Sequence, residues 1–272
     1  AYLELRGKDG RLHPSFNQSG HVEENVDTAG AAPATGRFSC SGPNVQQIPH
    51  HGIDDQWQQK VRTCLVAAPG HVLLSGDIAQ EEPRIVAWLS GDKRLLGDFA
   101  NGVPIYAPIG KAVYGMEIDK HRDPVRWHVA KQAFLCLCYG GQWRKLKELE
   151  PALSDHEAQY VARMLQNMYP GLTSFYQQTL VELHAQGQVR DVFGRIRRFP
   201  ALYSNDKFQI EAAEREAINF KIQGPGGSIM KLAMQKVDRD LGRGYIVSTE
   251  HDAVKLEVPD EMTFAAVVVL RG

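Results

Sequence analysis

Two aspartates in this chain each follow an apolar run that has the composition of a β-strand. Residues 71–76 (HVLLSG) lead into Asp77, and residues 244–251 (GYIVSTEH) lead into Asp252. Carboxylates at neighbouring strand ends can hold a pair of divalent cations, which is the arrangement that phosphoryl transfer uses. A single aspartate after a strand is more simply explained as a turn residue, so only the pairing of Asp77 with Asp252 favours metal binding. Hard oxygen ligands of this kind suit Mg²⁺.

A second candidate group lies between the two aspartates, in residues 131–140 (KQAFLCLCYG). Lys131, Leu135 and Tyr139 recur at intervals of four residues, so on a helix they share one face. A face of this kind, with a basic side chain at one end, suits a bound nucleotide. Plain core packing explains Leu135 nearly as well.

The elements expected to position these residues follow from the apolar periodicity. We predict a strand over residues 70–77 and two further strands around a tight turn at His251 and Asp252. Apolar residues at helical spacing predict helices over residues 80–89, 93–99, 105–114, 125–139, 158–168 and 172–186.

Other segments are predicted from their glycine and proline residues. Residues 188–199 indicate a hairpin with Gly194 in its turn, and residues 1–20 a second, short hairpin. The segment GPGG at 224–227 is expected to interrupt a helical pattern that spans residues 208–241.

Composition limits the classes of function that this chain can have. The 272 residues carry a formal net charge of −1 and are 43% hydrophobic, which is ordinary for a globular protein of one large domain or two lobes. A nucleic-acid partner would therefore have to use local basic clusters, of which Arg195, Arg197 and Arg198 form the densest. The four cysteines include no C-x-x-C pair, so a structural zinc site is disfavoured. No apolar run is long enough for a membrane helix.

Six segments, taken in order, resemble the family A DNA polymerases, the DNA polymerase I type found in bacteria and phages. The resemblance spans nearly the whole chain, and six motifs in the family's order leave little room for coincidence. The segments are 35–49 (TGRFSCSGPNVQQIP), 76–84 (GDIAQEEPR, similar to motif A), 131–140 (similar to motif B), 187–195 (GQVRDVFGR), 213–234, and 250–252 (EHD, similar to motif C).

The resemblance implies an α/β fold of the α+β kind. A palm with an antiparallel sheet would carry Asp77 and Asp252, and a mostly helical fingers subdomain would be inserted between them. The expected divisions are a residual thumb and palm segment at 1–48, palm with motif A at 49–85, fingers with motif B at 86–218, and palm with motif C at 219–272. The chain starts at Ala1 and stops on an apolar run at 264–270, so we expect a fragment of a longer protein.

The resemblance also implies an activity, which is template-directed DNA synthesis. Deoxynucleoside triphosphates (dNTPs) and primer-template DNA would be the substrates, two Mg²⁺ ions the cofactors, and the cytoplasm of a bacterial or phage-infected cell the location, with no membrane partner. The two aspartates would hold the metal ions, and Lys131 would bind the triphosphate and protonate the leaving pyrophosphate. Glu82 would exclude a ribose 2′-hydroxyl by crowding.

The same resemblance extends to two sets of binding residues. The residues expected to contact the nucleotide are Gln80, Glu82, Tyr106, Arg126, Lys131, Leu135 and Tyr139. The residues expected to contact the DNA are Arg11, Asn17, Arg37, Asn44, Gln46, Arg195, Arg215, Asn219, Gln223 and His251.

The chain departs from the family's pattern at several positions. Trp127 stands where motif B carries an arginine one turn before its lysine, so Arg126 would have to reach around the helix. Tyr106 stands where a histidine is common, and Ala253 where motif C usually has a glutamate. Two alternatives stay open: a single-subunit RNA polymerase, against which Glu82 argues, and a DNA-binding relic that has lost catalysis, which Trp127 and Ala253 favour.

Overall fold

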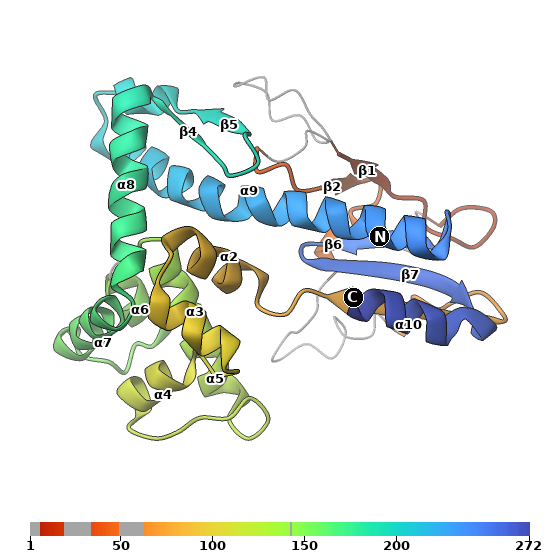
Figure 1. The fold of residues 1–272 in the computed structure, drawn as a ribbon, viewed down its shortest axis with the longest axis horizontal. Helices are drawn as coiled ribbons and strands as arrows, with labels where there is room; N and C mark the ends of the chain where they lie inside the picture. Colours follow the sequence, from red (N-terminus) through yellow and green to blue (C-terminus); the bar gives the residue numbers. More distant parts are fainter. Residues whose placement is uncertain (1–5, 19–33, 49–62, 142) are drawn as a thin grey trace. The chain divides into compact units, whose positions relative to one another are not determined.

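The computed structural model describes residues 6–18, 34–48 and 63–272, apart from residue 142. Within it the chain divides into two compact units. The first comprises Ala1–Ala79 together with Gln223–Gly272, and the second comprises Gln80–Ile222. The helices of the second unit stand between two strands of the first in sequence (Figure 1). The predicted α/β class, with an antiparallel sheet and a helical insertion, is confirmed.

The first unit is built on a three-stranded antiparallel sheet in the order β3-β7-β6. Its strands are β3 (His71–Asp77), β6 (Ile246–Glu250) and β7 (Ala253–Pro259), as the sequence predicts. Successive side chains of a strand point to opposite faces, and along the central strand β7 every second residue is buried. The buried face packs in a core cluster composed of Met230, Val237, Val254, Leu256, Val258 and Ala266. The other face of β7 carries Ala253, Lys255 and Glu257.

Two helices supply the remainder of this core. The first is the C-terminal part of α9 (Lys207–Leu241), and the second is α10 (Thr263–Arg271), which follows the short turn η4 (Asp260–Met262). The segment over 264–270, which by sequence reads as either strand or helix, is helical. None of the helices in the described ranges is both long and apolar enough to cross a bilayer.

The N-terminal segments of the first unit form a small two-stranded sheet. In it, β1 (Ser15–Asn17) pairs antiparallel with β2 (Ser39–Ser41), and the 3₁₀ turn η2 (Val45–Gln47) follows. The hairpin predicted within residues 1–20 would join residues 2–5 to residues 11–13, and β1 is neither of these strands, so its pairing stays a prediction. Its turn does form, since the Gly7 amide donates to the Arg11 carbonyl oxygen at 2.7 Å. Residues 2–5 of the prediction lie outside the described part.

The second unit is mostly helical. The predicted helices appear as α2, α3, α4, α5, α7 and α8, and the structure adds the short helix α6, which the periodicity did not indicate. Their bounds are α2 (Glu81–Ser90), α3 (Lys93–Ala100), α4 (Ala107–Tyr114), α5 (Pro124–Cys138), α6 (Trp143–Leu149), α7 (Asp155–Met168) and α8 (Pro170–Gln186).

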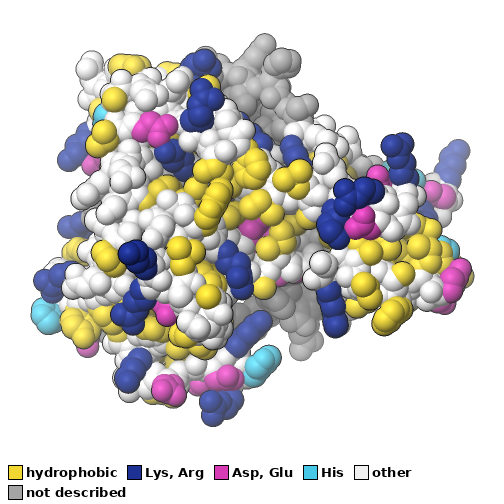
Figure 2. Space-filling view, in the orientation of Figure 1, with side chains coloured by type: hydrophobic (Ala, Val, Ile, Leu, Met, Phe, Trp, Pro, Cys, Tyr) yellow, Lys and Arg dark blue, Asp and Glu magenta, His cyan; other side chains and the backbone are white. Residues whose placement is uncertain are grey.

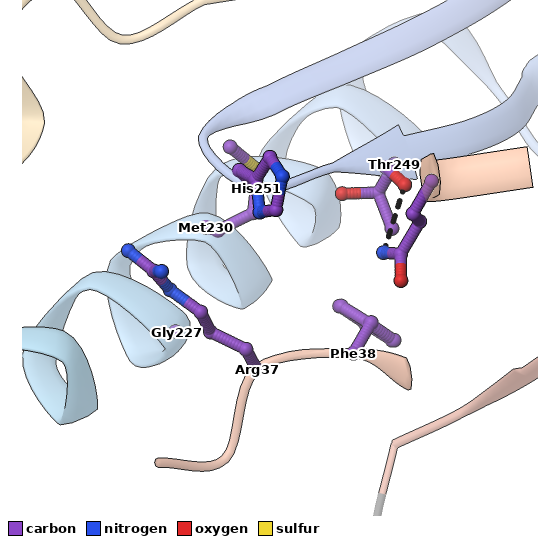
Figure 3. Close-up of a pocket in the computed structure, with 7 residues that line it drawn as sticks. Arg37, Phe38, Gly227, Met230, Thr249 and His251 are labelled. Atoms are coloured by element: carbon purple, nitrogen blue, oxygen red, sulfur yellow. Dashed lines mark hydrogen bonds between the residues drawn. The ribbon is translucent and has the colours of Figure 1, made fainter. Parts of the chain in front are cut away.

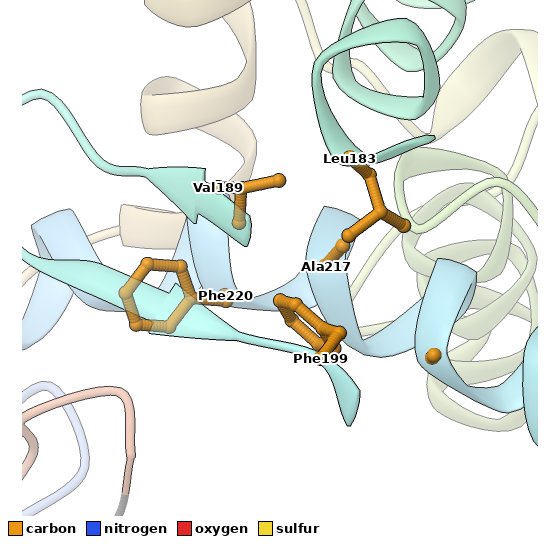
Figure 4. Close-up of a cluster of buried hydrophobic side chains, with 6 residues drawn as sticks. Leu183, Val189, Phe199, Ala217 and Phe220 are labelled. Carbon is orange, nitrogen blue, oxygen red and sulfur yellow. The ribbon is translucent and has the colours of Figure 1, made fainter. Parts of the chain in front are cut away.

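A hairpin of β4 (Gln188–Arg190) and β5 (Ile196–Arg198) follows α8, and then comes η3 (Pro200–Tyr203). The hairpin packs on α8 and on the N-terminal part of α9 around the two aromatic rings of Phe199 and Phe220 (Figure 4). The buried members of this cluster are Leu183, Val189, Phe199, Ala213, Ala217 and Phe220. The turn is tight because Gly194 adopts a φ of 86°, a left-handed conformation that glycine reaches without strain.

The predicted break at residues 224–227 is wrong, because α9 runs without interruption from Lys207 to Leu241. Pro225 lies inside the helix, where it cannot donate a backbone hydrogen bond and its ring crowds the preceding turn. All four residues from Gly224 to Gly227 are buried. Tertiary packing therefore overrides a local sequence that disfavours helix.

Candidate active site

The strand ends that carry the two aspartates are neighbours in the sheet. The β3–β7 register places Asp77 directly opposite Ala253, which is the residue after Asp252. The amide of Ile78 donates to the carbonyl oxygen of Asp252 at 3.0 Å, which extends the ladder by one step. The Asp77 side chain is exposed and that of Asp252 is half-buried. The structure thus brings together two acidic residues that are far apart in the sequence.

His251 and Asp252 form the turn between β6 and β7. His251 has a φ of 55°, in the left-handed region that side chains with a Cβ seldom adopt. Backbone in that region costs about 1–2 kcal/mol and is found where the surrounding structure dictates it, often at functional sites. The tight turn places both residues at the end of the sheet, next to Asp77.

A small groove, here called the Arg37 groove, lies beside this turn (Figure 3). Its volume is about 20 Å³, enough for a single water molecule. Gln46 is fixed there because its Nε2 donates to the carbonyl oxygen of Thr249 at 3.0 Å, while the Asn44 side chain caps η2 by accepting from the Gln46 amide at 3.1 Å. The lining residues are Arg37, Phe38, Gln46, Gly227, Met230, Thr249 and His251.

The Arg37 groove therefore contains three of the predicted DNA contacts, and Asn44 supports one of them. Arg37, Gln46 and His251 come from three separate elements and present nitrogen donors around one small space. Arginine and glutamine donors of this kind suit the acceptor atoms of a minor groove, which nearly every base pair presents in the same pattern.

Two other predicted DNA contacts are engaged within the protein. Arg11 lies 2.8 Å from the Glu257 carboxylate on the half-buried face of β7, and the same carboxylate accepts the Ala68 amide at 2.7 Å. Arg195 lies 3.2 Å from the buried Asp191 carboxylate, which also accepts the Arg195 amide and so closes the β4–β5 turn. Both arginines have structural partners in this conformation.

The remaining predicted DNA contacts are distributed over β1 and α9. Asn17 is half-buried and lies opposite Ser39 in the β1–β2 pair. Arg215 is exposed on α9 with Asn219 one turn further on, and Gln223 is half-buried. On the face drawn in Figure 2, Lys and Arg side chains are interspersed with acidic and apolar ones.

In the second unit, α5 presents the predicted nucleotide face. Lys131 is exposed, and Leu135 and Tyr139 are half-buried, whereas the neighbouring Phe134 and Cys138 are buried in the core. The Tyr139 amide donates to the Leu135 carbonyl oxygen at 3.1 Å, so the last turn keeps its helical geometry up to Tyr139. The three residues of the predicted nucleotide face are therefore less buried than Phe134 and Cys138 beside them.

Two of the departures from the family's pattern contact each other. The rings of Tyr106 and Trp127 meet edge to face at 5.5 Å, and Tyr106 meets Phe134 in the same way at 5.7 Å. Tyr106 is 3% exposed, so it has almost no surface to offer a nucleotide. Burial, with smaller contributions from Cys138 and Glu82, raises the pKa of Tyr106 to about 12. This aromatic pair packs α4 against α5.

Arg126, the expected substitute for the missing arginine, is held away from the Lys131 face. Its guanidinium lies 5.5 Å from the centre of the Tyr114 ring and 3.7 Å from the Asp123 carboxylate, and it donates to the Met116 sulfur. To contact a triphosphate, Arg126 would have to leave these three partners.

The start of α2 carries the other predicted nucleotide contacts. Gln80 precedes the helix with a φ of 55°, and Glu82 is half-buried in the first turn. The Glu82 carboxylate interacts electrostatically with the hydroxyl of Tyr106 and the thiol of Cys138. Glu82 is thus next to the buried side of α5.

One feature near the aspartates was not anticipated from the sequence. Glu250 lies opposite Ala253 in the β6–β7 pair, so Asp77, Ala253 and Glu250 form one row across the three strands. Glu250, the last residue of β6, is 3% exposed and forms an ion pair with Lys255 of the central strand β7. The resemblance to motif C included Glu250, but it gave no sign of this ion pair. Within the described ranges, no three acidic, histidine or cysteine side chains gather closely enough to hold a metal ion by themselves.

Comparisons with known proteins agree with this architecture. DNA polymerase I from Thermus aquaticus is 34% identical over 261 residues, which cover 94% of this chain and 29% of that protein. DNA polymerase I from Mycobacterium tuberculosis is 31% identical over 267 residues, which cover 96% of this chain and 27% of that protein. The chain thus spans less than a third of these relatives.

A solved structure extends the likeness to the fold. The POL domain of Pol1 from M. smegmatis, in complex with DNA primer-template and dNTP, matches with a TM-score of 0.84 at 29% identity, covering 99% of this chain and 45% of that one. The sequence profile of DNA polymerase family A matches residues 2–271. The chain belongs to DNA polymerase family A.

Proposed function

We propose that this chain carries out template-directed DNA synthesis, adding deoxynucleoside monophosphates from dNTPs to a primer 3′-hydroxyl. The observation that carries the proposal is the pairing of Asp77 with Asp252 at adjacent strand ends. In this assignment the unit Ala1–Ala79 with Gln223–Gly272 is the palm, and the unit Gln80–Ile222 is the fingers.

The donor set at the two strand ends fits two Mg²⁺ ions. Carboxylate oxygens are the ligands that Mg²⁺ prefers, and this ion keeps waters and uses substrate phosphates to complete its shell, so two protein carboxylates suffice. The exposed Asp77 side chain leaves room for a substrate. When bound, the metal ions would neutralise charge on the triphosphate and favour ionisation of the primer hydroxyl.

The remaining chemistry is assigned to side chains of this chain. Lys131, exposed on α5, would bind the triphosphate and donate a proton to the leaving pyrophosphate. Glu82 would crowd the sugar 2′ position. Arg37, Gln46 and His251 would donate to minor-groove acceptors of the duplex, and thereby test the shape of a base pair without reading its sequence.

Primer extension by the full-length protein tests this proposal, with Asp77→Asn and Asp252→Asn as matched variants that keep side-chain size. Each variant should lose about 10³-fold or more in rate, or about 4 kcal/mol of transition-state stabilisation, while retaining affinity for primer-template DNA. Dideoxy-terminated primers and ribonucleotides serve as controls. A parent protein that binds DNA but does not extend a primer would support the relic interpretation, and equal use of ribonucleotides would support the RNA polymerase alternative.

A further inference from the structure

The Arg37 groove rests on an unusually close backbone contact. A Cβ atom placed on Gly227 of α9 would lie 3.0 Å from the Arg37 nitrogen and 3.1 Å from both the carbonyl carbon and the oxygen of Gly36. These are backbone atoms, which cannot rotate away as the end of a flexible side chain can. A Cβ at 227 would therefore require residues 36–37 or the helix to shift by a few tenths of an ångström. Figure 3 shows Gly227 and Arg37 next to each other.

Residues 36–37, which cross α9 at Gly227, also include a glycine at the point of contact. Gly36 has a φ of 70°, which residues with a Cβ rarely adopt, and it directly precedes Arg37. Two glycines therefore meet where the segment crosses α9, one on each side of the contact. Gly227 and its three preceding residues are buried.

The contact between Gly227 and residues 36–37 affects the Arg37 groove because the three donor residues of the groove are held in different ways. Gln46 is anchored by its bond to Thr249, and His251 is fixed by its turn. Arg37 belongs to a segment that lies on Gly227. The distance between this segment and α9 therefore determines where the Arg37 side chain lies along the helix.

We infer that Gly227 is a positioning residue that seats residues 36–37 on α9 and so places the Arg37 guanidinium for contact with the DNA duplex. The inference rests on the proposed function for the identity of the ligand. An alanine at 227 would push the segment outward by a few tenths of an ångström and displace the guanidinium from its neighbours Gln46 and His251.

The test uses the full-length protein with four variants: Gly227→Ala, Arg37→Ala, their double mutant, and Gly97→Ala as the control. Gly97 lies inside α3, and a Cβ there would meet nothing within 4 Å. Alanine favours helix over glycine at both sites, so Gly97→Ala should raise the thermal midpoint and leave DNA binding unchanged. Gly227→Ala should instead weaken primer-template affinity about tenfold, which is the loss expected for one displaced charged hydrogen bond.

The double mutant distinguishes positioning from general damage. If Gly227 acts through Arg37, Gly227→Ala should weaken binding less than about twofold when Arg37 is already alanine, whereas independent effects would multiply. The KM for primer-template DNA should rise while kcat at saturating DNA stays within about twofold. Wild-type affinity in Gly227→Ala, or multiplicative losses in the double mutant, would overturn the inference.

Two further outcomes keep the inference separate from the proposed function. If Gly227→Ala does not fold, Gly36→Ala perturbs the same crossing from the loop side and should give the same loss, again dependent on Arg37. If Arg37→Ala binds DNA like the parent, the positioning role fails, and this outcome leaves the Asp77→Asn test of DNA synthesis unaffected. If Asp77→Asn extends primers normally, the proposed function itself fails.

Discussion

Ile78 and Asp252 are joined by a backbone hydrogen bond of 3.0 Å, although 174 positions separate them in the sequence. This bond continues the ladder in which Asp77 lies opposite Ala253, so the two acidic strand ends are held by the sheet itself. Because ladder hydrogen bonds fix both backbones, the Cα atoms that carry the two carboxylates are placed before any ligand binds. Such preorganisation is what a site for metal ions and phosphates requires.

Adding a carboxylate at position 253 should strengthen metal binding. Ala253→Glu would place a third acidic group opposite Asp77, and we expect the Mg²⁺ concentration for half-maximal primer extension to fall about threefold or more. Without metal, the like charges should lower the free energy of unfolding by about 0.5–1 kcal/mol. Ala253→Gln, of the same size and uncharged, is the control. An unchanged Mg²⁺ titration would show that position 253 does not face the metal site.

The buried ion pair between Glu250 and Lys255 should matter for stability. Lys255→Met leaves the Glu250 carboxylate buried without its cation, and we expect a loss of about 2–3 kcal/mol in unfolding free energy, measured by chemical denaturation. Glu250→Gln combined with Lys255→Met should recover part of this loss. The control is Lys236→Met, which breaks an exposed pair with Asp240 and should cost less than about 0.5 kcal/mol. Equal costs for Lys255→Met and Lys236→Met would contradict the prediction.

The Glu257 carboxylate should make stability depend on pH. The hydrogen bond from Arg11, followed by that from the Ala68 amide, holds the pKa of Glu257 below its usual value of 4.5. A carboxyl group with a lower pKa in the folded state adds stability that is complete above the unfolded pKa and is lost as pH falls through the folded pKa. Glu257→Gln should therefore be less stable than the parent at pH 7, and the difference should shrink below about pH 4.5.

Denaturation curves of the parent and Glu257→Gln at several pH values between about 3 and 7 measure this effect. Glu261 is an exposed glutamate of the same unit, and Glu261→Gln serves as the control with little expected change at any pH. A stability difference for Glu257→Gln that stays constant across the range would mean that the ion pair does not set the titration.

Lys131 and Arg126 should differ sharply in their contribution to nucleotide incorporation. Lys131 is exposed on the proposed nucleotide face of α5, whereas Arg126 is engaged with Tyr114, Met116 and Asp123. We expect Lys131→Ala to lower kcat/KM for dNTP about 10²-fold or more in single-nucleotide incorporation, and Arg126→Ala about threefold or less. Lys120→Ala, at an exposed lysine before α5, is the control. Comparable losses at both positions would assign the triphosphate contact to Arg126 as well.

Local sequence accounted for most elements of the fold and for the identity of the chemical groups. Strand β3, the strands around His251 and Asp252, and helix α5 with Lys131 on its outer face all follow from periodicity, because a residue's face depends only on its spacing along one element. The family motifs likewise carry their side chains within short segments.

The tertiary structure decided what depends on contacts between distant segments. Helix α9 continues past Pro225, because the packing of residues 224–227 in the folded chain outweighs an unfavourable local sequence. The tertiary structure also paired Arg11 with Glu257, joined the departures Tyr106 and Trp127 into one packed pair, and set residues 36–37 on Gly227. Such contacts depend on which surfaces meet in the folded chain, and spacing along the sequence does not encode that directly.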